Sequence, residues 1–311
     1  MKNRFIKDLQ VNEVIEDVFY VEEVKELNYK SKPGSFLILS IKDKSGITEA
    51  KIWDPGTLQE EIRPGTFVKF KGRVVKYNDN LELHIDSCST AAVEEVDPQD
   101  FLPASPYDVS LMVLKLKELI STISNPHLHL LLATFLKSEF FNDFCKAPAA
   151  KVIHQPYVGG LLEHSLKVAE ITAKICELYD DIDRDLAVTG ALLHDIGKIY
   201  DYTYEYAIDI TTEGRLLGHI IQGVKIAEDL TEKVSGFPAD LKLKLKHIIL
   251  SHHGQYEWQS PVLPQFVEAY LVHMVDLLEA DLWKFRELKK KYPGQDWSPW
   301  EEGLGRKVYL K

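Results

Sequence analysis

Histidine and aspartate residues in the C-terminal half of this chain recur beside apolar residues at helical spacing. Five segments show the pattern, and their polar residues are His164, the doublet His194-Asp195, His219, His252 and Asp276. His164, for example, precedes Val168, Ile171 and Ile175 at offsets of 4, 7 and 11. Such offsets place the polar group on the apolar face of a helix. We therefore expect five helices that each present an imidazole or a carboxylate toward the same buried side.

Buried groups of this kind need partners, because burying an unpaired carboxylate costs on the order of several kcal/mol. A hydrogen-bonded core histidine would explain any one of them alone, but a divalent cation would satisfy all of them together. Mixed imidazole and carboxylate ligands without a thiolate suit Mn²⁺, Fe²⁺, Co²⁺, Ni²⁺ or Zn²⁺. Helical phase favours His252 over His253 as a ligand, since His252 continues the stripe of Leu245 and Ile248. His253 remains the alternative ligand or a substrate contact, and His273 is predicted to pack.

The elements that must position these residues divide the chain by their periodicity. Residues 1–95 contain five short β-rich runs, which suit a small barrel better than a sandwich; they are 14–25, 35–41, 47–53, 67–75 and 81–87. After them the pattern is helical, with Asp108 and Asn125 as N-caps. We predict a multidomain protein in which a small all-β barrel (1–95) and a helical connector (96–150) precede an all-α bundle (151–311).

Composition limits the partners and the compartment. The 37 Lys and Arg against 48 Asp and Glu give a net charge of −11, so nucleic-acid binding would need a local patch or a metal. Three scattered cysteines indicate a reducing compartment without a disulfide framework. No apolar run approaches the about 20 residues of a membrane span, and the start lacks a signal-peptide core. We predict a cytoplasmic protein with no membrane partner, and a homo-oligomer stays open.

The segment SFLILSIKDKSGITEAKIW (35–53), followed by GTFVKFKGRV (65–74), resembles the OB-fold of the tRNA-anticodon and single-stranded DNA-binding type. Lys69, Lys71 and Arg73 alternate along one run, so they share a strand face, as do Lys51 and Trp53. Cations beside an aromatic ring form a platform for single strands, where each stacked base contributes about 1–3 kcal/mol. We expect this surface to contact single-stranded RNA or DNA; an ordinary solvated sheet face is the alternative.

The histidine segments resemble the HD-domain phosphohydrolase superfamily through GGLLEHS, LLHDIGK and a late aspartate. The resemblance implies a four-residue metal site of His164, His194, Asp195 and Asp276. His219 in LLGH and His252 in LSHHG match the members that hold two metals, in which Asp195 bridges the ions. The cofactor prediction is therefore two divalent ions, with Mn²⁺ first and Fe²⁺, Co²⁺, Ni²⁺ or Zn²⁺ as alternatives.

The same resemblance implies phosphoester hydrolysis. Two metals generate a bound hydroxide near neutral pH and neutralise the phosphate oxygens. Asp195, His194 and Lys198 are the predicted catalytic residues. Lys198 is included because in the family an equivalent lysine lies close to the scissile phosphate. The alternative for Lys198 is a lysine at a helix end that opposes the macrodipole. From their positions beside the ligands, we predict that His154 and Arg215 contact substrate.

The order of segments narrows the function. An OB-fold, a helical connector and an HD domain with HQPYVGGLLEHS, HDIGK, TTEGRLLGH and LSHHGQYEWQSP resembles the YhaM-like 3′→5′ exoribonuclease family. Gln155 departs from the family pattern, which has a second histidine there. The resemblance implies hydrolysis of single-stranded RNA, with single-stranded DNA as a second substrate, to nucleoside 5′-monophosphates.

Two alternatives remain at this stage. One is an HD phosphodiesterase of a small nucleotide, although the cyclic-dinucleotide subclass has Gly-Tyr-Pro after its double histidine and this chain has Gly254-Gln255-Tyr256. The other is a non-catalytic nucleic-acid-binding factor that uses the metal as a structural staple.

Overall fold

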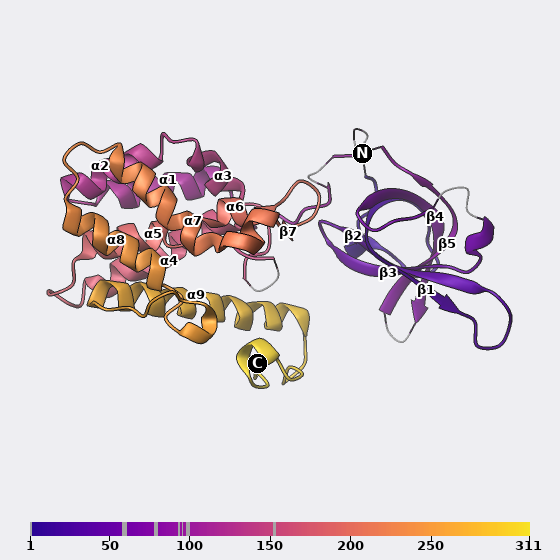
Figure 1. The fold of residues 1–311 in the computed structure, drawn as a ribbon. Helices are drawn as coiled ribbons and strands as arrows, with labels where there is room; N and C mark the ends of the chain where they lie inside the picture. Colours follow the sequence, from indigo (N-terminus) through magenta and orange to yellow (C-terminus); the bar gives the residue numbers. More distant parts are fainter. Residues whose placement is uncertain are drawn as a thin grey trace. The chain divides into compact units, whose positions relative to one another are not determined.

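A computed structural model of the protein describes residues 2–57, 61–77, 80–92, 94, 96–97, 100–151 and 154–311. The chain forms two compact units: Met1–Pro103 with Glu205–Ala207, and Ala104–Tyr204 with Ile208–Lys311. The first unit is a β-barrel and the second is helical (Figure 1). The predicted fold class is therefore confirmed. The predicted domain boundary at 95/96 stays a prediction, and residue 95 lies outside the described residues.

Five strands form the closed barrel of the first unit. They are β1 (Val14–Asn28), β2 (Ser35–Asp43), β3 (Gly46–Ile52), β4 (Thr66–Tyr77) and β5 (Asn80–Thr90), in the order β1-β2-β3-β5-β4 around the barrel. Neighbours are antiparallel except β3 and β5. The first half of β1 pairs with β4 and its second half with β2, with a register shift between Val21 and Glu23. Such a bulge bends a strand, and here it lets one long strand join two sides of the barrel.

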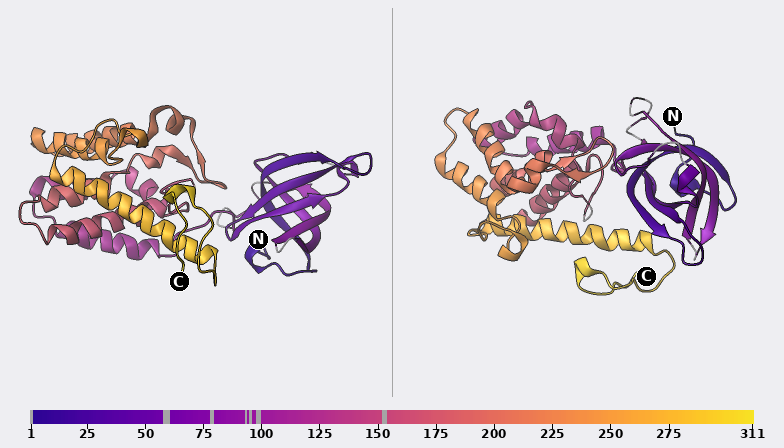
Figure 2. Two further views of the ribbon diagram at one scale, coloured as in Figure 1. Left: turned by 90° about the horizontal axis from the view of Figure 1, so that it is seen from below. Right: turned by 45° about the vertical axis from the view of Figure 1, so that its right-hand side comes forward.

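Alternation along the strands separates the core from the surface. On β4, Phe70 and Val74 are fully buried while Lys69, Lys71 and Arg73 are exposed, as the period of two requires. The short helix η1 (Ile6–Asp8) lies at one barrel opening (Figure 2). Ile6 and Leu9 pack with the core of the barrel. The helix η2 (Pro55–Thr57) follows β3.

The helical unit is built around one hydrophobic core. Its helices are α1 (Val109–Ser121), α2 (Pro126–Phe135), α3 (Phe140–Lys146), α4 (Gly160–Cys176), α5 (Arg184–Leu193), α6 (Lys198–Asp201), α7 (Thr212–Glu232), α8 (Ala239–Ser251) and α9 (Val267–Lys291), with the two-stranded sheet β6 (Tyr202–Thr203) and β7 (Asp209–Ile210). Asp108 and Asn125 cap α1 and α2 through their side chains, as predicted. Apolar residues of α1, α2 and α3 belong to the same core cluster as those of α4, α5 and α9, so the stretch predicted as a connector packs into the bundle.

Helix α9 runs along one side of the bundle, and the chain after it folds back against its last turns (Figure 2). That segment contains η6 (Glu302–Leu304) and forms a small cluster in which Val308 and Leu310 pack with Leu288. The helix η5 (Tyr256–Trp258) lies between α8 and α9. Among the residues that the structure describes, no helix combines the length and the apolar character needed to cross a membrane.

Candidate functional site

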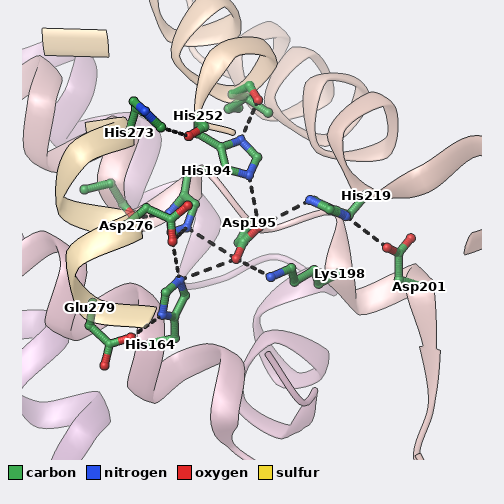
Figure 3. A network of polar contacts seen from close by, with 12 residues as sticks. His164, His194, Asp195, Lys198, Asp201, His219, His252, His273, Asp276 and Glu279 are labelled. Carbon is green, nitrogen blue, oxygen red and sulfur yellow. Dashed lines mark hydrogen bonds and ion pairs between the residues drawn. The ribbon is translucent and has the colours of Figure 1, made fainter. Parts of the chain in front are cut away.

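Five helical segments bring the predicted polar residues together in the second unit (Figure 3). His164 lies within α4 and Asp276 within α9, whereas His194 and His252 are the C-cap residues of α5 and α8. His219 follows a kink in α7 at Gly218, where φ is 72° and ψ is 155°. Only glycine adopts that backbone conformation readily, so Gly218 redirects the helix immediately before the histidine.

Asp195 lies at the centre of the group. Its Oδ2 is 2.6 Å from Lys198 Nζ, 3.3 Å from His194 Nε2 and 3.6 Å from His164 Nε2. Its Oδ1 is 3.3 Å from His252 Nε2 and 3.6 Å from His219 Nε2. The two carboxylate oxygens therefore face two different sets of histidines, which we call the first set (His164 and His194) and the second set (His219 and His252).

Asp276 belongs to the first set alone. Its Oδ1 lies 3.1 Å from His164 Nε2 and 3.7 Å from His194 Nε2. His253 lies beside the second set, with its ring centroid 4.6 Å from that of His252 and 5.2 Å from that of His219. Potential ligand atoms of His164, His194 and Asp276 lie within 4.8 Å of one another, and so do those of His219, His252 and His253. The geometry thus offers two ligand groups that share Asp195.

Each of these imidazoles is oriented by a bond at its other nitrogen. His194 and His252 donate from Nδ1 to the carbonyls of Ala191 and Ile249, each at 2.8 Å. Both acceptors lie three residues back in the last helical turn, where carbonyls lack helical partners. A histidine at the C-cap can therefore satisfy an orphan carbonyl and point Nε2 outward, a function that the sequence pattern alone did not reveal.

Carboxylates orient the other two imidazoles. His164 Nδ1 lies 2.7 Å from Glu279 Oε2, and His219 Nδ1 lies 3.1 Å from Asp201 Oδ2. Gln155 is buried and donates its side-chain amide to Glu279 Oε1 at 2.8 Å. Carboxylate partners of this kind fix the tautomer and strengthen a histidine as a metal ligand. Sequence reasoning missed Glu279 and Asp201; the only signal was that Glu279 follows Asp276 by three residues on one helix.

The Nε2 atoms that converge on Asp195 are buried without hydrogen-bond partners in the described part of the chain. These atoms belong to His164, His194, His219 and His252, and Asp195 Oδ1 is likewise without a partner. Because buried polar atoms are nearly always satisfied in native proteins, such a cluster calls for a missing partner. Four imidazole nitrogens and two carboxylates match the ligands of first-row divalent metals. The residues present therefore fit a metal centre, and the HD-type metal site expected from the sequence has the side chains it needs.

The pKa shifts differ between the two histidine sets. Burial lowers the pKa of His164 and of His194, but the neighbouring carboxylates outweigh burial and raise both, that of His194 to about 10. Burial alone would raise the pKa of the Asp195 carboxyl, but the Lys198 ammonium and the His194 imidazole hold that pKa well below its usual range. Burial lowers the pKa of His219 and of His252 below the usual histidine value. In the second set, burial therefore favours the neutral imidazoles that a metal requires.

Two further predicted residues lie next to the metal-ligand cluster, which we call the cage and which consists of the first set, the second set, Asp195 and Asp276. Lys198 is buried and contacts Asp195 as stated. The His154 ring centroid is 4.9 Å from that of His164, and both His154 nitrogens are buried without a hydrogen-bond partner among described residues. Burial, and then the Lys198 charge, hold the pKa of His154 well below the usual value. Arg215, in contrast, is not brought into the cage: its side chain is exposed and lies 3.6 Å from Asp209.

A glycine contact sets the spacing between Asp195 and the second set. A Cβ atom on Gly197 would lie 1.9 Å from the His219 carbonyl oxygen and 2.5 Å from the Gly223 nitrogen. Such distances are impossible for any side chain. The absence of a side chain at Gly197 therefore lets the backbone after Asp195 touch the backbone of α7 at His219.

In the first unit, aromatic rings gather around Trp53 on the outside of the barrel. The Trp53 ring stacks on Phe36 with centroids 5.2 Å apart and on Tyr29 at 6.5 Å, and it meets the His84 ring edge-on at 5.4 Å. Trp53 is 43% exposed. His84 is the register partner of Arg73 on β4, so Arg73 projects from the same face. The predicted tryptophan and one predicted cation thus lie on either side of His84.

The basic residues of this face differ in their availability. Lys69, Lys71 and Arg73 are exposed as predicted, although Lys69 pairs with Glu16 at 2.7 Å. The expectation that Lys51 offers its charge beside Trp53 was wrong. Lys51 is buried in an ion pair with Glu82, because Glu82 lies two residues before His84, the register partner of Lys51 on β5, and so supplies a carboxylate on the same face. The exposed surface consists of aromatic rings flanked by β4 cations.

Comparison with known proteins agrees with this geometry. Residues 161–281 match the family model of the HD domain. The second unit contains an HD domain. HD domains form a superfamily of metal-dependent phosphohydrolases, and the HD domain here includes every residue of both histidine sets. Residues 21–91 match the model of an OB-fold nucleic acid binding domain, so the barrel is an OB-fold.

Two similar solved structures each match about 30% of this chain. The second OB-fold domain of replication protein A from Methanococcus maripaludis is 22% identical, with a TM-score of 0.24, and the match covers 30% of this chain and 98% of that domain. The p204 HINb domain is 14% identical, with a TM-score of 0.25, over 29% of this chain and 47% of that one. The assignment of the barrel rests on the family model and the strand order.

Proposed function

We propose that the protein is a metal-dependent 3′→5′ exoribonuclease of the YhaM-like family, which hydrolyses single-stranded RNA, and single-stranded DNA as a second substrate, to nucleoside 5′-monophosphates. The observation that carries the proposal is the set of four Nε2 atoms around Asp195 that make no hydrogen bond within the described residues, in a chain that also has a nucleic-acid-binding OB-fold. The finer points, namely attack from the 3′ end and RNA as a substrate, are supported by the family resemblance of the four sequence segments quoted above.

The ligands follow from the two histidine sets. His164, His194 and Asp276 would hold one ion, His219 and His252 the other, and Asp195 would contribute one oxygen to each; His253 is the further candidate for the second ion. Divalent ions in such a cage supply a water of lowered pKa and neutralise phosphate oxygens. Mn²⁺ is the first candidate, and this ligand chemistry also suits Fe²⁺, Co²⁺, Ni²⁺ and Zn²⁺.

The chain's own residues have separate roles beside the ions. The Asp195 carboxylate raises the pKa of Lys198 despite the opposing effect of burial, so Lys198 stays cationic and can offset charge that develops on the phosphate. Burial holds the pKa of His154 well below its usual value, which favours the neutral imidazole, and its nitrogens have no hydrogen-bond partner among described residues. Its ring N–H can therefore donate a hydrogen bond to a phosphate oxygen next to the first set.

The OB-fold accounts for the preference for strands over small nucleotides. Tyr29, Phe36 and Trp53 offer stacked rings at which unpaired bases can bind, and Lys71 and Arg73 offer charge to the backbone. A small diffusible nucleotide would not need this surface. Weakening it by Phe36→Ala with Trp53→Ala should lower processing of a 20-nucleotide strand and spare a small phosphodiester.

A direct test is digestion of a 5′-labelled 20-nucleotide RNA with Mn²⁺, with other divalent ions and with a chelator. We expect a ladder that shortens from the 3′ end with nucleoside 5′-monophosphates as products, no product with chelator, and no product from His194→Ala, which should still bind the strand. Products from the 5′ end would contradict the proposed polarity. Turnover of small nucleotides alone would favour the small-nucleotide phosphodiesterase, and strand binding without any product would favour the non-catalytic factor.

A further inference from the structure

The last part of the chain has a charge opposite to that of the whole. Residues 284–311 contain eight Lys or Arg against four Asp or Glu, a local net charge of +4 in a chain of −11. The run Lys289-Lys290-Lys291 ends α9, and neither the metal cage nor the OB face uses it. Two of the five tryptophans, Trp297 and Trp300, also lie here. Basic residues interleaved with aromatic ones are the composition of surfaces that bind single-stranded nucleic acid.

The segment that follows α9 is a hairpin with an apolar side and an aromatic side. The Ser298 nitrogen donates to the Val308 carbonyl, and the Leu310 nitrogen donates to the Asp296 carbonyl, both at 2.9 Å. We call this segment the 296–310 hairpin. Val308 and Leu310 face Leu288 of α9 and are buried. The docking of these residues fixes which side of the hairpin faces solvent.

Three large aromatic rings of the hairpin are exposed to solvent. Trp297 is 56% exposed, Trp300 61% and Tyr309 54%. Trp297 and Tyr309 pair across the hairpin, with ring centroids 5.2 Å apart. Large aromatic rings are normally buried, so several exposed together mark a binding surface. Because the aliphatic neighbours already satisfy the core, these rings are available to a ligand without rearrangement of the hairpin.

A groove separates the last turns of α9 from the hairpin. Its volume is about 620 Å³, and its charged lining consists of Lys284, Lys290 and Lys291 with Glu287 and Glu301. Lys290 pairs with Glu287 at 2.6 Å. Pockets of this size accommodate a small organic group. The lysines of the lining outnumber its glutamates, three to two, and this excess of positive charge favours a phosphate-bearing group.

We propose that the 296–310 hairpin and the basic end of α9 form a second binding surface for the single strand, on the HD-containing unit itself. Bases stack on Trp297, Trp300 and Tyr309, and the lysines of α9 contact the phosphates. The local positive charge selects a polyanion over an ordinary protein partner, and the flat exposed rings select unpaired bases over a duplex. The inference rests on the proposed function because the strand it binds is the proposed substrate.

The surface lies at a defined distance from the cage along one helix. Asp276 and Leu288 are both on α9 and twelve residues apart, which corresponds to about 18 Å of helix. A stacked strand rises about 3.4 Å per nucleotide, so about five nucleotides span this interval. A strand whose 3′ end occupies the cage would therefore reach the hairpin only when it is longer than about five nucleotides.

The test compares strand lengths in the full chain. Trp297→Ala with Trp300→Ala should raise KM for a 20-nucleotide strand at least about fivefold, the low end of the stacking contribution of one base. Turnover of a trinucleotide and of bis(p-nitrophenyl) phosphate should not change. Tyr179→Ala, which alters an exposed ring elsewhere on the same unit, is the matched control. Unchanged KM for the long strand, or an equal loss for the trinucleotide, would overturn the proposal.

Two more variants separate stacking from other effects. Trp300→Phe should keep most of the affinity whereas Trp300→Leu should lose it, because leucine is apolar but cannot stack. Neutralising Lys289, Lys290 and Lys291 to Ala should reduce the slope of log K against log salt by about 2 if three phosphate contacts are lost, and Lys174→Ala should not. A retained slope would remove the lysines from the site.

Strand binding is also measured without turnover, by fluorescence anisotropy of a labelled 20-nucleotide strand with chelator present. Absence of product from every substrate would contradict the proposed function, whereas unchanged anisotropy in the tryptophan double variant would contradict the second surface alone. If the double variant instead changes only the sedimentation coefficient, the hairpin is a protein–protein contact and the proposal is wrong.

Discussion

Each unit of the molecule encloses a carboxylate between a lysine and histidine, with opposite results. In the OB-fold, Glu82 receives Lys51 on Oε2 and His84 on Oε1, the latter at 2.8 Å. His84 then accepts a hydrogen bond from Trp53 Nε1 through its Nδ1 at 3.4 Å. In the HD domain, Asp195 contacts Lys198, yet its Oδ1 and the four Nε2 atoms around it make no hydrogen bond within the described residues.

The two clusters differ in whether their polar atoms are satisfied by the protein alone. The Glu82 cluster is complete within the protein, so it holds strands together and needs no ligand. The Asp195 cluster is complete only when a cation is added. The same three kinds of side chain, a carboxylate, a lysine and a histidine, therefore give a structural cluster in one unit and a candidate metal centre in the other, and the number of unsatisfied atoms distinguishes them.

Removing Asp195 should give the largest effect. We expect Asp195→Ala to lower hydrolysis more than about 1,000-fold, because the metals contribute several kcal/mol to stabilising the transition state. Metal content by mass spectrometry should fall in parallel, and chelation of the unaltered protein should reproduce the loss. Asp180→Ala, an exposed aspartate in the same unit, should change neither value; retained activity in Asp195→Ala would remove the metal centre from the mechanism.

Breaking the complete cluster should cost stability and leave catalysis intact. Glu82→Ala strands a buried lysine, so we expect the OB-fold to lose about 3 kcal/mol of unfolding free energy. Trp53 is the only tryptophan in residues 1–103, so its ¹⁹F resonance in fluorotryptophan-labelled protein reports on this unit during urea unfolding. Lys69→Ala breaks an exposed pair and should change stability by less than about 1 kcal/mol. Loss of metal content on Glu82→Ala would contradict the contrast between the clusters.

The carboxylate behind His164 should have an intermediate effect. Glu279→Gln removes the charge that orients this imidazole, and partners of this kind typically contribute 10–100-fold, so we expect metal affinity or activity to fall by about that factor. Titration with Mn²⁺ followed by activity measures it, with Glu170→Gln on the exposed side of α4 as the control. An unchanged Mn²⁺ titration would mean that backbone packing alone orients His164.

The aromatic face should contribute about tenfold. Trp53→Ala should weaken binding of a 20-nucleotide strand by about this factor and Trp53→Phe by much less, because stacking of one base contributes about 1–3 kcal/mol. Anisotropy with chelator present isolates binding from hydrolysis. Equal losses in both variants would assign Trp53 to the fold, through its bond to His84, rather than to the strand.

The smallest effect concerns acid. Burial tends to raise the pKa of Glu82, but Lys51 and His84 hold it below its usual value. A carboxyl with a depressed folded-state pKa stabilises the protein above its unfolded pKa, about 4.3, and loses that contribution as the pH falls through the folded value. The OB-fold should therefore lose stability below about pH 4.3, measured by the Trp53 resonance in urea. Glu82→Gln should flatten this dependence, and an unchanged profile would exclude Glu82 as its source.

Sequence patterns predicted the architecture well because alternation and capping are local. The barrel strands, the N-caps at Asp108 and Asn125, and the exposed run of Lys69, Lys71 and Arg73 all follow from residues close together in the chain. The convergence of the histidines was predictable for the same reason, since each helix must turn its apolar face inward and a polar residue on that face is therefore buried with it.

Partners that depend on contacts between distant segments were not predictable. The sequence pattern predicts that Lys51 is a surface cation. Only the parallel pairing of β3 with β5 brings Glu82 close enough to bury the lysine in an ion pair. Glu279 and Asp201 look like ordinary helix carboxylates, because nothing local indicates that they face His164 and His219. Arg215 precedes His219 by only four residues. It lies in the exposed first turn of α7, however, and the kink at Gly218 separates it from the histidine.

Contact between backbones at Gly197 and His219 has a consequence for engineering. Where side chains set the distance between two backbone segments, substitution can change that distance in small steps. Here the backbones at Gly197 and His219 are already in contact, so any larger residue at position 197 would push Asp195 away from the second set. The metal selectivity of such a centre would therefore be changed by exchanging ligand residues, because substitution at Gly197 cannot adjust the distance between Asp195 and His219 in small steps.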